Sequence, residues 1–136
     1  MYKQPEAPHD GAAFDAALAK LRTQHATLRS VATLTIRERL STDAVLSLAD
    51  AVKVHELNEA VLFETPFLTR MPRLVRATAE RLQRCSSEYT SNNHGLASHT
   101  ASAARFVDAL LTHIAAEEAW LRRESAHRTE HRLTIA

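Results

Sequence analysis

Residues 45–64, with the sequence VLSLADAVKVHELNEAVLFE, decide the fold. Their inward positions are Val45, Leu48, Val52, His55, Glu59 and Leu62. These positions recur every three or four residues, as on one face of an amphipathic helix, and all are apolar except two. The exceptions, His55 and Glu59, lie one helical turn apart on the face that should meet a core. Because burial penalises a polar group without a partner, something inside the fold must satisfy them, and a metal ion is one candidate.

The composition of the chain predicts a single helical domain. The 136 residues are a usual length for one domain, and 45% of them are apolar, which is enough for a hydrophobic core. Glycine occurs twice and proline four times, which favours helices and leaves little material for hairpin turns. The formal net charge is +1 with both signs interspersed, so neither nucleic acid nor a membrane is expected as a partner.

Features that report on location all favour the cytoplasm. The single cysteine, Cys85, excludes an internal disulfide and fits a reducing compartment. No apolar run approaches the roughly 20 residues of a membrane span. The N-terminal residues lack the apolar core of a signal peptide, so we expect a cytoplasmic protein.

Four segments share the amphipathic helical pattern. They are residues 12–34, 45–64, 73–89 and 96–124. Short connections between helices of this length predict an all-α, up-down-up-down four-helix bundle over residues 12–126. Residues 1–11 are expected to form a flexible leader, and residues 127–136 a polar tail.

Histidine interrupts the apolar face in two further segments. His25 lies on the face of residues 12–34, and His113 with Glu117 one turn later lies on the face of residues 96–124. Counted from the helix centres at about 1.5 Å per residue, the histidines of the three segments fall at one depth in the bundle. The residues predicted to converge there are His25, His55, Glu59, His113 and Glu117. They would form either a metal site or a buried polar cluster paired within itself; imidazole and carboxylate ligands suit iron, manganese or zinc.

The segment 73–89 offers no equivalent ligand. Its inward positions are Val75, Thr78, Leu82, Cys85 and Tyr89. Glu80 should point outward, since it lies about 200° around the helix axis from Leu82. A ferritin-like centre is disfavoured, because it needs two inward Glu-x-x-His motifs and only Glu124 with His127 matches.

The pattern of His25, His55 with Glu59, and His113 with Glu117 resembles that of the hemerythrin-like (HHE cation-binding) domain family. The sequences HELNEAVLF at 55–63 and HIAAEEAWL at 113–121 look like the signatures of its second and fourth helices. The resemblance covers about residues 12–125 and implies a hemerythrin-like bundle with those five residues as metal ligands.

The third helix is where the chain departs from the family. Thr78 or Leu82 stands where the family has a histidine, and Glu80 could replace it only if the helix were rotated from the inferred register. This degenerate helix could leave an open coordination position, a single-metal site or no metal. Outer support for the ligands could come from Glu56, Glu118, Tyr89 or Cys85, although packing or solvent exposure explains these residues equally well.

The family resemblance also implies a function. A complete ligand set in the family holds a non-haem di-iron centre that binds oxygen or serves in sensing oxygen, iron or nitric oxide. We therefore expect one or two iron ions per chain, or another divalent metal, and a small diatomic ligand such as oxygen. The alternative is a metal-free four-helix bundle that acts as an interaction or regulatory module. An enzyme is the least supported class, because the chain has no phosphate-binding loop and no nucleophile motif.

Overall fold

The computed structural model describes residues 11–62, 69–91 and 96–135, and these residues form helices without any strand. The four helices are α1 (Gly11–Arg37), α2 (Thr42–Leu62), α4 (Arg73–Ser91) and α5 (Leu96–Ile135). The predicted all-α class with four long helices is therefore confirmed. The expected leader up to residue 10 and much of the two connections, at 63–68 and 92–95, lie outside the described residues.

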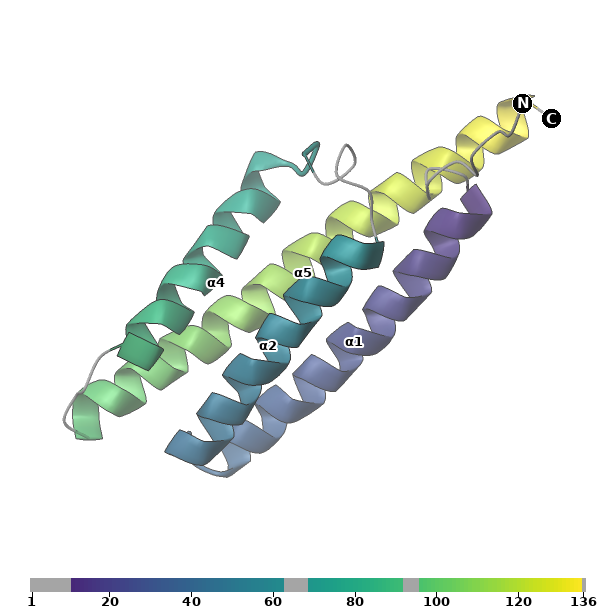
Figure 1. The fold of residues 1–136 in the computed structure, drawn as a ribbon. Coiled ribbons are helices and arrows are strands. Elements are labelled where there is room, and N and C mark those ends of the chain that lie inside the picture. The colour runs from purple at the N-terminus through teal and green to yellow at the C-terminus, as the bar shows by residue number, and fades with distance from the viewer. Residues whose placement is uncertain (1–10, 63–68, 92–95, 136) are drawn as a thin grey trace, which may run out of the picture.

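The helices lie side by side as a bundle (Figure 1). The closely packed pairs are α4 with α5, α1 with α2, and α1 with α5. The seam between α2 and α4 is not among them, so these two helices are in looser contact than the three closely packed pairs. Within the described ranges, no helix has both the length and the apolar character that crossing a membrane requires.

The predicted apolar faces are buried and form two clusters. The large cluster contains residues of all four helices: Leu28, Ala32, Val45, Leu48, Ala49, Val52, Leu82, Cys85, Tyr89, Ala103, Phe106, Val107, Ala109, Leu110 and Ile114. The small cluster joins α1, α4 and α5 through Phe14, Ala17, Leu18, Leu21, Val75, Trp120 and Leu121. Burial of these side chains is the main stabilising contribution to the bundle.

Helix α5 continues well beyond Glu124, its predicted end. Its added turns contact the start of α1: the Arg128 guanidinium lies 4.2 Å from the centre of the Phe14 ring, and the Ser125 hydroxyl donates to Asp15 Oδ1 at 3.1 Å. These contacts join residues far apart in sequence and give an otherwise polar segment a packed face. Hydrophobic periodicity within α5 alone could not reveal them.

A tight turn joins α1 to α2. Arg39 and Leu40 adopt positive φ values of 58° and 56°, in the left-handed region that favours glycine. The Leu40 N–H donates to the carbonyl of Thr35 at 2.9 Å, which closes the end of α1. Ser41 then caps α2, because its hydroxyl oxygen accepts from the N–H of Ala44 at 3.4 Å.

Replacing Arg39 by glycine should stabilise this turn. A left-handed conformation costs a residue with a Cβ about 1–2 kcal/mol, and the larger chain entropy of unfolded glycine returns part of that gain. We therefore expect Arg39→Gly to raise the free energy of unfolding by about 0.5–1 kcal/mol in urea denaturation. Ala26→Gly, at an exposed right-handed position of α1, should lower it by about 1 kcal/mol. Equal effects of the two substitutions would contradict the strained turn.

Candidate metal centre

A layer of polar side chains crosses the bundle between the two apolar clusters. On α1, His25 lies between Leu21 of the small cluster and Leu28 of the large cluster. On α5, Glu117 lies between Ile114 and Trp120 in the same way. His25 is 0% exposed and Glu117 is 1% exposed. Groups as polar as these remain folded inside only when other polar groups or ions satisfy them.

The layer brings together the side chains predicted from the sequence. Around Glu117, Oε1 lies 3.1 Å from His25 Nε2 and 4.0 Å from His55 Nε2, and Oε2 lies 3.2 Å from His113 Nε2. Glu59 Oε2 lies 3.4 Å from His55 Nε2. The rings of His25 and His55 are tilted against each other with centroids 4.9 Å apart. Helices α1, α2 and α5 thus place three histidines and two glutamates at one point, as the depth count predicted.

Each of the three histidines also has a partner on its outer nitrogen, Nδ1. His25 Nδ1 lies 3.2 Å from Glu118 Oε1, and His55 Nδ1 lies 2.9 Å from Gln24 Oε1. His113 Nδ1 lies 3.0 Å from the hydroxyl of Thr78. All three rings therefore turn Nδ1 towards a partner at the edge of the layer and Nε2 towards the central carboxylates.

These outer partners assign the proton of two of the rings. The Thr78 hydroxyl donates its one hydrogen to the Val75 carbonyl at 2.7 Å, so it can only accept from His113 Nδ1. The oxygen atoms of Gln24 and Glu118 are likewise acceptors from His55 and His25. Nδ1 of His55 and of His113 therefore carries the hydrogen when these rings are neutral, whereas His25 faces an acceptor oxygen with both of its nitrogens.

A neutral His55 or His113 ring in this tautomer turns the lone pair of Nε2 towards a carboxylate oxygen, to which it cannot hydrogen-bond. His25 Nε2 lies 3.1 Å from Glu117 Oε1 in a hydrogen bond that needs a proton on this nitrogen. His55 Nε2 and Glu117 Oε2 are indeed buried without a hydrogen-bond partner, although each lies within ion-pair distance of a neighbour of opposite type. A cation resolves this arrangement: either extra protons on the rings or a metal ion that accepts lone pairs from nitrogen and oxygen together. A metal ion bound here would give His55 Nε2 and Glu117 Oε2 the partner that they lack.

The pKa values of the central groups reflect the same electrostatics. Burial opposes ionisation of Glu117, but hydrogen bonds with His113 and His25 outweigh burial and hold its pKa well below the usual range. Burial raises the pKa of Glu59, with the charge of Glu117 adding to the shift and His55 opposing it. Burial would lower the pKa of His113, but the hydrogen bond and charge of Glu117 raise it above the usual value. These surroundings therefore favour the ionised form of Glu117, and its negative charge attracts cations.

Three of the side chains are close enough to hold one metal ion together. His25, His55 and Glu117 each offer a ligand atom, and these atoms lie within 4.8 Å of one another. Two histidines and one carboxylate are a ligand set found in mononuclear non-haem iron sites, which keep further positions open. His113 and Glu59 adjoin this trio as further candidate ligands.

Helix α4 has the register inferred from the sequence. Thr78 is half-buried against His113, whereas Glu80 is exposed, so neither a histidine nor a carboxylate of α4 lies in the polar layer. Two other residues considered as outer support lie elsewhere: Cys85 packs in the large cluster, and the Tyr89 hydroxyl lies 3.2 Å from His99 Nε2. His99 does not share the site, because its Nε2 lies beside the hydroxyls of Thr42 and Tyr89 instead.

Sequence reasoning missed two residues that support the centre. Gln24 fixes the ring of His55, and Arg29 binds Glu118 through two hydrogen bonds of 3.0 and 2.9 Å. Arg29 lies one turn after His25, and this spacing was the only available signal. Burial opposes ionisation of Glu118, but Arg29 and His25 outweigh it and lower its pKa, so Glu118 holds His25 as a charged acceptor.

Comparisons of the chain with protein-family models, curated proteins and solved structures found no match. The hemerythrin-like resemblance thus stays a prediction drawn from the residues. What the structure adds is a buried group of His25, His55 and Glu117 that could hold a metal ion, with the other predicted ligands beside it.

Removing the charge of Glu118 should weaken metal binding without unfolding the bundle. Outer partners of metal-binding histidines typically contribute about 10- to 100-fold to affinity, so Glu118→Gln should lower the affinity for Co²⁺ by about that factor in a chelator competition titration. Asp108→Asn is the matched control, because it also removes one carboxylate charge from α5. Asp108 lies away from the polar layer and forms an exposed 2.8 Å ion pair with Arg81 of α4. An unchanged affinity in Glu118→Gln, or an equal loss in both variants, would contradict this role.

Proposed function

We propose that this chain is a hemerythrin-like, non-haem iron protein that binds oxygen or a related diatomic molecule, or senses redox or iron state. The observation that carries the proposal is the orientation of three histidines whose Nδ1 atoms are bound outward and whose Nε2 atoms converge on buried carboxylates. Metal-binding histidines in proteins are held in this way by an outer acceptor.

Charge favours a metal over protons alone. A paired set of imidazolium and carboxylate ions would bring several charges into the interior, where each loses the hydration it has in water. A divalent ion neutralises Glu117 and Glu59 with its own two charges and leaves the three rings neutral. It would also satisfy His55 Nε2 and Glu117 Oε2, which have no hydrogen-bond partner.

The arrangement of the helices is consistent with the proposed type of fold. We infer an up-down-up-down bundle of hemerythrin-like topology. The colour gradient in Figure 1, whose sense reverses from each helix to the next, supports it. Ligands in such bundles come from side chains that project inward from facing helices, as His25, His55 and His113 do.

Iron bound in this centre would supply a redox-active ion with a coordination position for a small ligand. His25, His55 and Glu117 would hold it, with His113 and Glu59 as additional ligands for the same ion or a second one. Thr78 provides no ligand from α4 and instead fixes the ring of His113, which favours an open position on that side. The two apolar clusters exclude water from above and below the layer. A cytoplasmic location agrees with the single cysteine.

A second candidate function is a metal-free bundle that acts as an interaction or regulatory module. The ion pairs of Glu117 with His25 and His113 favour it, since protonated rings could satisfy most of the layer without a metal. The two candidates differ in metal content and in their response to substitution of the same residues.

The iron proposal predicts metal in the purified protein. Untagged protein from iron-supplemented cells, prepared without chelators, should contain about one or two iron ions per chain by mass spectrometry. His55→Ala should contain little, because it removes one of the three closest ligands. Thr42→Ala is a control on the same helix, remote from the polar layer. Iron-free wild-type protein whose melting temperature does not change with added iron would overturn the proposal.

Replacing His113 by leucine separates the two candidates. Under the iron proposal, added Fe²⁺ at 100 times its dissociation constant stabilises the wild type by about 2.7 kcal/mol, and His113→Leu reduces this increment. Under the metal-free alternative, iron stabilises neither protein, and the leucine variant is less stable than the wild type, because buried Glu117 loses one of its ion-pair partners. Thermal unfolding under nitrogen, with and without Fe²⁺, measures both quantities.

A further inference from the structure

A cleft of about 320 Å³ opens at the loose seam between α2 and α4 and reaches the polar layer. Its lining consists of Glu56, Glu59, Ala60, Met71, Arg76, Ala79, Glu80, Gln83, His113 and Glu117. His113 and Glu117 are buried members of the polar layer, whereas Glu56 and Glu80 are exposed. The cleft therefore connects the surface with the candidate metal centre. Ala60 and Ala79, one from each facing helix, help to keep it open, because their side chains are short.

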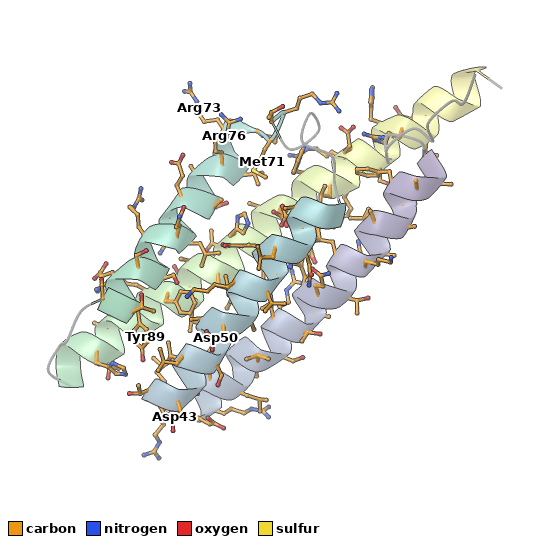
Figure 2. All side chains as sticks on the ribbon, viewed as in Figure 1. Asp43, Asp50, Met71, Arg73, Arg76 and Tyr89 are labelled. Atoms are coloured by element: carbon orange, nitrogen blue, oxygen red, sulfur yellow. The ribbon has the colours of Figure 1, made fainter. Side chains whose placement is uncertain are left out.

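Carboxylates line the cleft from its exposed residues to the polar layer. Glu56 and Glu80 are exposed, Glu59 is partly buried, and Glu117 is almost fully buried. The lining contains one arginine, Arg76, whose guanidinium donates hydrogen bonds to the backbone carbonyls of Thr69 and Met71 at 3.2 Å each. Figure 2 shows Met71 and Arg76 together at the N-terminal end of α4, with Arg73 beside them. Four carboxylates against one guanidinium make the cleft attractive to cations.

The buried part of the cleft holds a group that still needs a ligand. Glu117 Oε2 is buried without a hydrogen-bond partner, and Glu117 is part of the lining. A row of surface carboxylates alone would be an ordinary solvated face. Here the row leads to a buried carboxylate oxygen that has an ion-pair neighbour, His113 Nε2 at 3.2 Å, but no hydrogen-bond donor, so a cation that follows the row gains a ligand at its end.

We propose that this cleft is the uptake route for a divalent cation, captured at Glu56 and Glu80 and passed by Glu59 to Glu117. The inference rests on the proposed metal function and adds two residues that the ligand set does not use. Oxygen ligands at successive depths would replace the hydration shell of the ion in steps. The exposed carboxylates act at long range and set the rate of capture, whereas the ligands of the polar layer set the rate of release.

The test measures loading of the whole 136-residue chain, freed of metal, with Co²⁺ under nitrogen in a stopped-flow spectrometer. Electrostatic steering accounts for about 10-fold or more in association rate, so Glu56→Gln with Glu80→Gln should slow Co²⁺ association by about 3- to 10-fold and flatten its dependence on salt. Gln83→Glu, which adds a carboxylate to the exposed part of the cleft, should speed it. Glu38→Gln with Asp43→Asn, at and just after the turn between α1 and α2, removes the same two charges from exposed positions elsewhere and should have little effect.

A second variant tests the route without changing charge. Ala79→Leu adds three carbon atoms inside the cleft, so it should slow both loading and release, measured by transfer of Co²⁺ to a chelator, and leave the dissociation constant unchanged. In the charge variants, by contrast, the release rate should change much less than the association rate.

The outcomes separate this inference from the function on which it rests. If wild-type protein binds neither Co²⁺ nor Fe²⁺, the metal function itself fails and the uptake route fails with it. If Co²⁺ binds normally but loads at the wild-type rate in all of the cleft variants, the metal function stands and the route is wrong. If Glu56→Gln and Glu80→Gln instead accelerate release as much as they slow loading, these residues are ligands of the bound ion, and the route is again wrong.

Discussion

A buried carboxylate that faces three imidazole nitrogens is the constraint on which this structure depends. Glu117 is 1% exposed, and its neighbours His25, His55 and His113 come from α1, α2 and α5. A charge taken out of water loses several kcal/mol of hydration, so it must meet opposite charge or a metal. Three helices must therefore align at one depth for the bundle to be stable with Glu117 ionised.

This requirement also selects one packing of the helices. A slip of α1 by one turn would place Leu21 or Leu28 beside Glu117 instead of His25 and leave the carboxylate against an apolar side chain. The two apolar clusters alone discriminate weakly against such a slip, because one leucine of α1 would fill the place of another. The polar layer supplies the discrimination, as single buried polar residues do in coiled coils.

The sequence predicted this layer because helices have a constant rise, so that counting along each apolar face was enough to bring His25 and His55 to one depth. It predicted the helices for the same reason. The supporting residues could not be found in this way: Gln24 and Arg29 lie off the apolar faces, and their roles depend on side chains of α2 and α5. The added length of α5 escaped prediction because it depends on contacts with the start of α1, which no local pattern encodes.

Helix α4 stabilises the bundle on one side and borders the cleft to the polar layer on the other. It packs closely on α5 and contributes Thr78 as a support for His113, but it sends no ligand into the layer and leaves its seam with α2 loose. A long ligating side chain at the position of Ala79 would fill the cleft that reaches Glu117. The cleft is therefore present because α4 sends no ligand side chain into this space. The remaining helix contacts hold the layer together, and the side that lacks a ligand is the side from which an ion or a small molecule can approach it.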